Sequence, residues 1–466
     1  MIRLQKLFIR KVGQFSKIAA RRPELDFDRL LNPENLASIR ENIRCRKQVG
    51  DIDQLHRLWN NLQTVIQDKN PTITMNELTS MWDRFYEEAL LIPNDTHPEA
   101  PVGKSVPFVL FIFVLFSNAF FDLIVGDESA AKIIHTNGSK PIFTFKPLFG
   151  EDIAVKFKIL WQDVGFCCGE KAYFLYNQLA ILELALIQFC RDRLRSSGFE
   201  EVVVPDVIPK RIVENCGLMN RTDKEIVYSI HGLPNWTLSG TAEMGLASFI
   251  ENRIFDVNEM PKKFFSVSRC FRPEVATGKL SKGLYRVHEF TKVEMFICTA
   301  NETGLESNIS HLEILEMQKL LFSELNLHFN VLEMPTEELG ASAFRKFDIE
   351  SWFPGRDCYG EISSASNCTD YQSRRLLTKY KSSDGNLKFV HTVNKCIKLA
   401  KQNVNGTACA LSRTLIAMLE QFQCKNRQVN IPKFLLDYVN VEMKRQYAER
   451  KPLSLLRINP KTVFEC

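Results

Sequence analysis

The sequence lacks any pair or cluster of cysteines with the spacing of a zinc site. Its 13 cysteines are scattered over 466 residues, and the closest two, Cys167 and Cys168, are adjacent and would make a poor structural bridge. This distribution predicts reduced thiols in a reducing compartment. Four of the cysteines are expected to be small, buried apolar side chains: Cys270, Cys298, Cys358 and Cys368.

The sequence also lacks internal repeats, low-complexity tracts and a strong excess of either charge. There are 60 Lys and Arg residues and 55 Asp and Glu residues, a net charge of +5, and 45% of the residues are hydrophobic. This composition is typical of a globular protein, and the length predicts one large core with a smaller appendage. A mildly basic chain is compatible with an RNA partner, but the same charge is common in proteins that bind no nucleic acid.

Acidic residues are absent before Glu24, whereas residues 1–23 are rich in basic and apolar residues. The basic ones are Arg3, Lys6, Arg10, Lys11, Lys17, Arg21 and Arg22. This composition is typical of a mitochondrial transit peptide, and it predicts a location in the mitochondrial matrix. The alternative is a basic amphipathic helix that binds RNA or frays.

Residues 50–92 have the apolar periodicity of two helices. The apolar positions are Ile52, Leu55, Trp59, Leu62 and Ile66, and then Leu78, Met81, Phe85, Ala89 and Ile92. A turn signal at residues 68–71 separates them, which predicts two antiparallel helices packed on each other. We expect them to lie in a short N-terminal helical unit, residues 24–102, which is either a projecting arm or an ordinary helical hairpin in a core.

One long apolar run, PFVLFIFVLFSNAFFDLIV at residues 107–125, has the length of a membrane span. Asn118 and Asp122 would be costly in hydrocarbon, and the dipeptide Val102-Gly103 recurs after the run as Val125-Gly126. The alternatives are a translated intron in residues 103–126, a core element, or a true span. The repeated flanks favour the insertion, and membrane association is not expected.

Beyond residue 126, alternating patterns predict strands at Phe264 to Arg272 and Arg286 to Thr299, and a helix is predicted at Gln178 to Arg193. Strands and helices do not alternate regularly, which predicts an α+β domain with an antiparallel sheet over residues 127–450. Residues 451–466 are expected to form a C-terminal tail.

If the two predicted strands pair, one face of the sheet carries charged and aromatic side chains. In extended strands alternate residues share a face, and the residues concerned are Arg272, Glu274, Arg286, Phe290 and Glu294. Guanidinium groups match phosphate oxygens, an aromatic ring stacks on adenine and a carboxylate pairs with an ammonium group. Such a face suits ATP and an amino acid, but an exposed face of salt bridges is the alternative.

Residues 270–296, CFRPEVATGKLSKGLYRVHEFTKVEMF, resemble the second signature motif of the class II aminoacyl-tRNA synthetases in its seryl version. Three further segments agree: Thr241-Ala242-Glu243 is similar to the serine-binding loop, EISSASNC at 361–368 to a strand of the family, and ALSRTLIAMLE around Arg413 to the third class II motif. The resemblance spans nearly all of residues 127–440. Stretches such as FRKFDIESWFPGR are similar to the animal mitochondrial branch.

The resemblance implies a class II sheet with flanking helices, and a homodimer that activates L-serine with ATP and transfers it to tRNA(Ser). Arg272, Arg413 and Glu361 would be catalytic. ATP would be bound by Arg272, Glu274, Arg286, Val287, His288, Phe290, Glu361, Ile362, Ser363, Ser364 and Arg413. Serine would be bound by Thr241, Ala242, Glu243, Arg272, Glu294 and Thr407, and Mg²⁺ by Glu361 and Ser364.

The chemistry implied needs positioning and charge neutralisation rather than a general base, because the serine carboxylate is ionised at neutral pH. His288 is therefore not expected to act as an acid or base.

The sequence departs from the family at residues 395–405, KCIKLAKQNVN, which interrupt the approach to the third motif and are flanked by repeated Val-Asn dipeptides. The helical unit also looks shorter than the tRNA-binding arm of the family. The alternative function is a catalytically silent relative that serves as a binding or regulatory subunit. Retention of the ATP and serine residues favours the enzyme.

Overall fold

The computed structural model describes residues 22–67, 73–102, 128–162, 168–169, 171–218, 227–273, 283–394, 409–426 and 428–447. The predicted transit peptide up to residue 21, the apolar run at 107–125, the segment 395–405 and the tail lie outside the described residues. Two predicted site residues, Glu274 and Thr407, also lie outside them.

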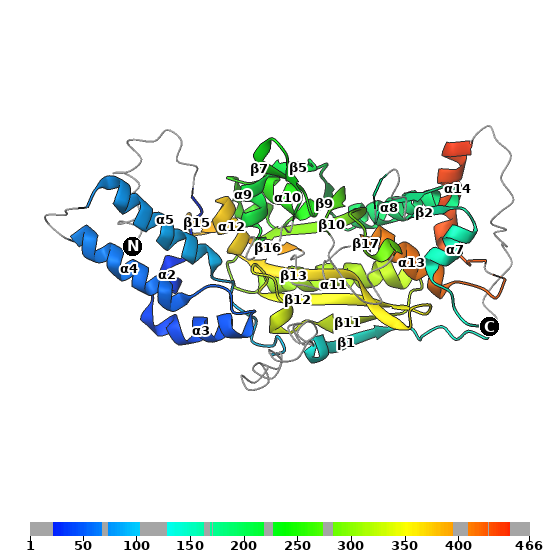
Figure 1. Cartoon of the computed structure of the whole chain (residues 1–466), viewed down its shortest axis with the longest axis horizontal. Coiled ribbons are helices and arrows are strands. Elements are labelled where there is room, and N and C mark those ends of the chain that lie inside the picture. The colour runs from blue at the N-terminus through cyan, green and yellow to red at the C-terminus, as the bar shows by residue number, and fades with distance from the viewer. Residues whose placement is uncertain are drawn as a thin grey trace.

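The N-terminal unit is helical and extends from one end of a larger unit that contains the main sheet (Figure 1). Its elements are α2 Phe27–Leu30, η1 Pro33–Asn35, α3 Leu36–Cys45, α4 Ile52–Gln67 and α5 Met75–Leu91. The backbone N–H of Asp51, before α4, donates to the Glu88 carboxylate near the end of α5 at 2.9 Å. The two helices are therefore antiparallel, as the periodicity predicted.

The apolar stripes of α4 and α5 meet in a small separate core. The side chains of Leu55, Leu62 and Phe85 are completely buried in it. The Trp59 and Phe85 rings lie 5.3 Å apart between centroids. At the start of α5, Thr74 and Glu77 form a reciprocal capping box that satisfies backbone donors of the first turn. Burial of these stripes explains why the helices form here.

The larger unit is built on a nine-stranded sheet in the order β1-β11-β12-β13-β16-β10-β9-β4, with β17 paired to β10. All its pairs are antiparallel except β4 with β9. The strands are β1 Lys132–Asn137, β4 Glu200–Glu201, β9 Lys262–Phe271, β10 Glu289–Thr299, β11 Phe329–Glu333, β12 Arg345–Phe353, β13 Cys358–Thr369, β16 His391–Asn394 and β17 Cys409–Ala410. This architecture confirms the predicted α+β class.

Helices cover the sheet and enclose a continuous apolar core. The helices are α7 Gly150–Lys156, α8 Gln178–Ser196, α9 Lys210–Asn215, α10 Ala242–Ile250, α11 Glu306–Glu324, α12 Tyr371–Leu376, α13 Leu411–Gln421 and α14 Lys433–Tyr447. The main core joins α8, α11 and α13 to side chains such as Val293 and Ile349. A second cluster packs Leu246 and Ile250 of α10 against Phe264 of β9 and Phe296 of β10.

Short elements complete the larger unit. The strands are β2 Leu160–Gln162, β3 Tyr173–Leu175, β5 Val207–Pro209, β6 Ser229–Ile230, β7 Leu233–Leu238, β8 Ile254–Asp256, β14 Lys379–Lys381 and β15 Leu387–Phe389, and the 3-10 turns are η2 Glu128–Ala130, η3 Val257–Glu259, η4 Gly283–Tyr285 and η5 Thr336–Glu338.

The hairpin predicted around residues 264–299 is present, with a later start for its second strand. Strands β9 and β10 pair antiparallel, with Ser266 opposite Glu294 and Cys270 opposite Phe290. The prediction that Arg286 lies on this strand is wrong, because turn η4 and the residues after it precede β10. Gly283 begins η4 at a φ of 65°, a conformation that glycine adopts without steric cost.

None of the ten cysteines in the described residues is part of a disulfide. Cys358 is only partly buried, unlike Cys270, Cys298 and Cys368, so the prediction that it is buried is wrong. In the part of the chain that the structure describes, no helix has both the length and the hydropathy needed to cross a bilayer. The predicted apolar run falls outside that part.

The helical unit is fixed to the larger unit by a short polar junction. Asn94 donates from its amide to the backbone carbonyls of Ser342 at 2.8 Å and Cys368 at 2.9 Å. Arg46 is buried and donates to the backbone carbonyls of Asn94 and Gly340. The junction therefore holds α3 and the chain after α5 against the end of β13.

Candidate functional site

The first group of predicted residues converges where α10 begins next to β10. Thr241 caps α10, since its Oγ1 accepts from the backbone N–H of Glu243 at 3.0 Å. The same hydroxyl donates to Oε2 of Glu294, and this oxygen also accepts from the Glu243 N–H at 3.2 Å. The start of a helix thus meets the side chain of a buried strand, and the predicted serine residues Thr241, Ala242, Glu243 and Glu294 lie together.

The Glu294 carboxylate belongs to a fully buried ion pair. Lys292 precedes it by two residues on β10, and its Nζ lies 2.9 Å from Oε2 of Glu294, with neither side chain exposed to solvent. Burial of ionic groups is costly, and removal of one partner leaves a buried charge uncompensated. The sequence prediction did not include Lys292, although its spacing of two residues from Glu294 was the available signal.

Arg272 lies just beyond β9 and its guanidinium is held against both a carbonyl and an aromatic ring. Nε and Nη2 each donate to the Gly240 carbonyl oxygen at 3.1 Å. The guanidinium carbon lies 5.1 Å from the centre of the Phe290 ring. Because Gly240 directly precedes Thr241, these contacts join two of the predicted ATP-binding residues, Arg272 and Phe290, to the start of α10.

A second cluster of predicted residues surrounds Tyr285. The guanidinium carbons of Arg413 and Arg286 lie 4.4 and 5.7 Å from the centre of its ring. Arg413 donates to the carbonyl oxygens of Tyr285 at 3.3 Å and Glu361 at 3.0 Å, and its Nη1 lies 3.6 Å from the Glu361 carboxylate. Two buried guanidinium groups thus lie close to the Tyr285 ring, and the Glu361 carboxylate lies beside one of them, that of Arg413.

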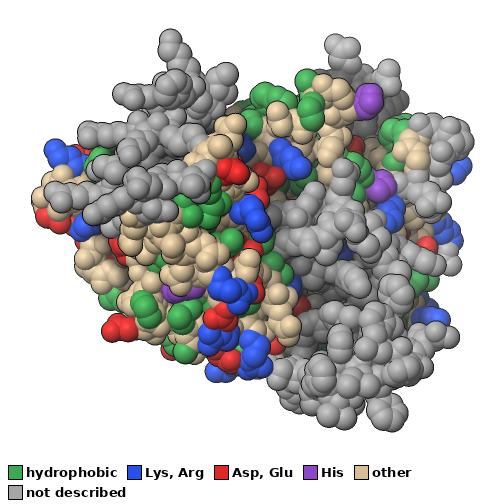
Figure 2. Space-filling model, turned by 60° about the vertical axis from the view of Figure 1, so that its left-hand side comes forward, with side chains coloured by type: hydrophobic (Ala, Val, Ile, Leu, Met, Phe, Trp, Pro, Cys, Tyr) green, Lys and Arg blue, Asp and Glu red, His purple; other side chains and the backbone are tan. Residues whose placement is uncertain are grey.

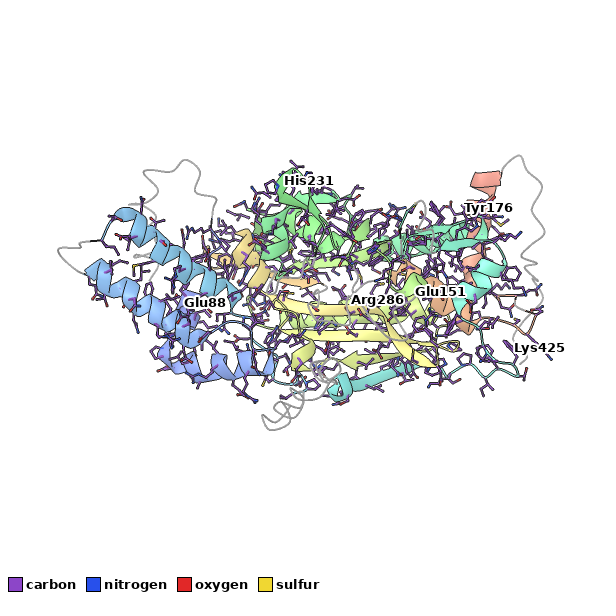
Figure 3. All side chains as sticks on the ribbon, viewed as in Figure 1. Glu88, Glu151, Tyr176, His231, Arg286 and Lys425 are labelled. Carbon is purple, nitrogen blue, oxygen red and sulfur yellow. The ribbon has the colours of Figure 1, made fainter. Side chains whose placement is uncertain are left out.

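Figure 3 shows Arg286 in the middle part of the larger unit, far from the helical unit that carries Glu88.

Tyr285, the centre of this cluster, is a neutral side chain. Burial raises the pKa of Tyr285 to about 12, although the nearby positive charge of Arg413 acts to lower it. Tyr285 is therefore neutral at physiological pH, and it serves as a platform for the arginines rather than as an acid or base. The sequence prediction missed this residue, whose only signal was its position next to Arg286.

The two residues predicted to bind Mg²⁺, Glu361 and Ser364, offer oxygen donors of the type that this ion prefers. Ser364 lies on β13 close to Glu361, and its buried Oγ has no hydrogen-bond partner among the described residues. A hydroxyl and a carboxylate oxygen are hard donors of the type that Mg²⁺ prefers, with phosphate and water oxygens completing the coordination. The described residues contain no group of three or more His, Cys, Asp or Glu arranged to hold a metal by themselves.

Several residues predicted to bind ATP direct their side chains into the apolar core. Val287 and Ile362 belong to the core cluster. Ser363 is fully buried opposite Ile349, which also belongs to that cluster. Contact of Val287, Ile362 and Ser363 with a nucleotide would therefore have to come from the backbone. Phe290 also belongs to the core cluster, but its ring lies against the Arg272 guanidinium.

His288 lies between the two hydrogen-bonding neighbours that fix its ring. Nδ1 is 2.6 Å from the Tyr228 hydroxyl and 3.2 Å from the Arg272 carbonyl oxygen. Its backbone carbonyl accepts from the Arg272 N–H at 2.8 Å. The residue therefore connects Arg272 to the loop before β10, which is a positional role.

Three comparisons with known proteins agree with this arrangement. Residues 231–422 match the family model described as the tRNA synthetase class II core domain (G, H, P, S and T). The chain is 39% identical to the mitochondrial serine–tRNA ligase of Mus musculus over 368 residues. The aligned residues make up 78% of this chain and 64% of the mouse protein. It is 37% identical to the serine–tRNA ligase of Rubrobacter xylanophilus over 79% of this chain and 78% of that protein.

Solved structures give the same result. The fold matches a crystal structure of seryl-tRNA synthetase from Pyrococcus horikoshii complexed with ATP with a TM-score of 0.68 at 27% identity, covering 93% of this chain and 95% of that chain. It also matches a crystal structure of cytoplasmic serine-tRNA ligase from Naegleria fowleri in complex with AMP, with a TM-score of 0.74 at 26% identity. This match covers 90% of this chain and 98% of that chain.

The chain spans only part of the mitochondrial relatives. The aligned residues make up 64% of the mouse protein and 66% of the Bos taurus protein, which is just under two thirds of their length.

Proposed function

The chain belongs to the serine–tRNA ligases, a family of class II aminoacyl-tRNA synthetases, and from this membership we propose that it activates L-serine with ATP. The carboxylate of serine attacks the α-phosphate, the bond between the α- and β-phosphates breaks, and seryl-adenylate and pyrophosphate form. The observation that carries the proposal is the presence of two buried polar clusters. In one, Thr241, Glu243 and Glu294 are hydrogen-bonded to one another next to Arg272. In the other, Arg286 and Arg413 pack against Tyr285.

At the serine end, two carboxylates lie where an ammonium group and a hydroxyl need partners. Glu243 and Glu294 are each about 1% exposed or less, so a cation bound there is shielded from water. A site that hydrogen-bonds the substrate hydroxyl discriminates strongly against an analogue that lacks it, because buried polar groups are then left unpaired. Thr241 and Glu294 would in this way favour serine over alanine.

At the phosphate end, three arginines neutralise charge. Arg272 would bind the α-phosphate, and Arg286 and Arg413, both fixed against Tyr285, would bind the distal phosphates. Phe290 beside Arg272 offers a ring on which adenine can stack. Glu361 and Ser364 would hold Mg²⁺, which would supply positive charge to the bound phosphates. Positioning and electrostatic stabilisation are the effects that such a reaction requires.

The second step would transfer serine to the 3′ end of tRNA(Ser). The helical unit extends from the larger unit as an arm and is the candidate surface for the tRNA (Figure 1). Among the described residues of the face shown in Figure 2, basic and acidic side chains are interspersed. Several arginines of the arm form ion pairs, such as Arg40 with Asp53. Binding would thus depend on local exchange of these pairs for phosphate contacts.

We propose that the enzyme works as a homodimer in mitochondria. The mitochondrial names of relatives support the location, together with the basic composition of residues 1–23. Exposed aromatic side chains on the ribbon β2–β3, Trp161 and Phe174, are surfaces that a second copy could bury. Sedimentation velocity would test the dimer, and a fusion of residues 1–23 to a fluorescent protein would test the targeting.

Isolation of the intermediate tests the proposed reaction. The purified chain is incubated with serine and ATP labelled in the α-phosphate, and the protein is separated from free nucleotide by gel filtration. We expect labelled seryl-adenylate to elute with the protein and to be consumed when tRNA(Ser) is added. A folded protein that retains no label, or that retains it equally without serine, would contradict the proposal.

A further inference from the structure

Helix α12 carries a buried glutamine, Gln372, that contacts the candidate serine site from outside. Its side chain is fully buried, and its Nε2 donates to Oε1 of Glu243 at 2.6 Å. On its other side, Oε1 accepts from Nδ2 of Asn394 at 2.6 Å and from Oγ1 of Thr392 at 2.9 Å. The amide therefore joins the first turn of α10 to strand β16.

The chemistry of its neighbours fixes the orientation of this amide. An ionised carboxylate only accepts hydrogen bonds, so the NH₂ group of Gln372 must face Glu243. The oxygen of Gln372 is then left to accept from Asn394 and Thr392. A flipped amide would place two acceptors against each other at Glu243 and two NH₂ groups together at Asn394. Only one orientation satisfies all these groups.

This arrangement restricts the movement of two side chains at once. The Glu243 carboxylate is held by one of its oxygens, and the Asn394 amide is held by its nitrogen while its oxygen accepts from the Cys368 thiol at 3.4 Å. Neither side chain can rotate without breaking a short hydrogen bond in a buried region of low dielectric. We propose that Gln372 is a positioning residue, which aims the Glu243 carboxylate at the ammonium group of the bound amino acid.

This inference rests on the proposed role of Glu243 in binding serine, and it predicts a selective effect. The contacts of the ATP residues Arg272, Arg286 and Arg413 described above are made with elements other than α12. Loss of the Gln372 amide is therefore expected to weaken binding of serine and to leave binding of ATP nearly unchanged. A glutamine that only stabilises the fold would not produce this split.

The chain offers a matched structural control in Gln421. It is also a buried glutamine, but its Nε2 donates to the carbonyls of His328 and Trp352 and to the Ser351 hydroxyl, and its oxygen accepts from the His328 N–H. None of these partners belongs to the candidate site. Gln421→Met should therefore lower Tm without changing the ratio of the KM for serine to the KM for ATP.

The first test compares Gln372→Met and Gln421→Met in ATP–pyrophosphate exchange. Methionine keeps most of the side-chain volume of glutamine but removes both hydrogen-bonding groups. We expect the KM for serine to rise about ten- to a hundredfold in Gln372→Met, because a hydrogen bond to a charged group is lost, and the KM for ATP to change by less than about twofold. An unchanged KM for serine, or equal increases in both KM values, would overturn the inference.

The second test uses Gln372→Glu and varies pH. When protonated, the carboxyl group that this substitution introduces can donate to Glu243 and accept from Asn394, as glutamine does, and two adjacent carboxylates share a proton readily. The KM for serine in this variant should therefore approach the wild-type value at low pH. As pH rises and the shared proton is lost, the carboxylates repel and the KM should rise relative to wild type. A ratio of variant to wild-type KM that does not vary with pH would contradict the inference.

Direct binding separates this inference from the proposed function. Calorimetric titration with serine, in the presence of a non-hydrolysable ATP analogue, needs no turnover. If the wild type binds serine but performs no exchange, the proposed activity fails, and weaker binding by Gln372→Met still supports the positioning role. If the wild type performs exchange and both proteins bind serine equally, only the positioning role fails. A wild type that binds no serine overturns both.

Discussion

The two units of the molecule differ in whether their ion pairs are exposed or buried. In the helical arm the core consists of apolar side chains such as Leu55 and Phe85, and ion pairs such as Arg40 with Asp53 lie on the surface. In the larger unit Lys292 and Glu294 pair in a fully buried position, and Arg272 is also buried. A core made only for stability does not need buried ions. The buried pair of Lys292 and Glu294 lies beside Thr241 and Glu243, which is the place where charge would serve a ligand.

The largest effect is expected from Glu294→Ala, which breaks the buried pair. Lys292 would be left as an uncompensated buried charge, which costs about 3–5 kcal/mol of stability, and the proposed partner of the serine hydroxyl would be lost. Chemical denaturation and pyrophosphate exchange should both detect the change. Glu294→Gln separates the loss of charge from the loss of volume, because it keeps the shape of the side chain and removes only the charge. A Glu294→Ala protein with wild-type stability would contradict the buried ion pair.

The next largest effect is expected from Arg413→Lys. Lysine keeps the charge but cannot reproduce the contacts of the guanidinium with two carbonyls and the Tyr285 ring. We expect kcat for exchange to fall by about 10²–10³, as for removal of a donor that stabilises transition-state charge. Tm should also fall, because two carbonyl oxygens lose a buried donor. A variant with full activity would remove Arg413 from the proposed mechanism.

A substitution in the core of the arm, Phe85→Ala, should reduce charging of tRNA but not activation of serine. The Phe85 ring lies 5.3 Å from Phe27 and from Trp59, and 5.6 Å from Trp82, so its loss would open a cavity that costs about 3–5 kcal/mol within the arm. Limited proteolysis should then cut the arm, and charging of tRNA should fall while serine-dependent exchange is retained. A parallel loss of exchange would show that the two units are not separable.

Buried histidine in the larger unit predicts a specific pH dependence. Burial lowers the pKa of His311 to about 4, whereas an unfolded chain has a value near 6.5. Between these values the unfolded state binds more protons, so stability is complete above about pH 6.5 and is lost as the pH falls toward 4, by about 3 kcal/mol in all. Urea denaturation from pH 7 to 4.5 would measure the slope. His311→Phe should remove its share of the slope, and an identical slope in that variant would contradict the assignment.

The smallest effect is expected at the surface of the arm, from Arg40→Ala. Arg40 pairs with Asp53 at 2.7 Å, with both side chains about half exposed. Ion pairs in such positions are screened by solvent and salt and contribute little. Tm should be unchanged within error. A clear decrease would mean that the ion pairs of the arm are structural after all.

Helices α4 and α5 and the hairpin of β9 and β10 could be predicted from the sequence. Apolar periodicity gave α4 and α5 correctly, because it reports burial on one face, and alternation gave the pairing of β9 with β10. Arg286 was placed wrongly on a strand, because alternation does not report where a turn such as η4 begins. Thr241, Glu294 and Arg413 were identified by motif resemblance. In the structure Thr241 contacts Glu294, and Arg413 lies in a second cluster with Tyr285 and Glu361.

Other features could not be predicted, because they depend on contacts between distant segments. Gln372 contacts Glu243 across 129 positions in the sequence, and no local pattern relates them. Val287 and Ile362 match the motifs of the family, but their side chains face the core. The status of the two unusual segments at 103–126 and 395–405, which suggested insertions, stays a prediction.

The most direct test of serine activation is ATP–pyrophosphate exchange by the purified chain and by Glu294→Gln, measured with serine and, separately, with alanine or threonine in its place. We expect exchange by the wild type to saturate with serine and to be at least about a hundredfold weaker with alanine. We expect it to be lost in Glu294→Gln. A folded wild-type protein without exchange, or with equal exchange for serine and alanine, would contradict the proposed activation of serine.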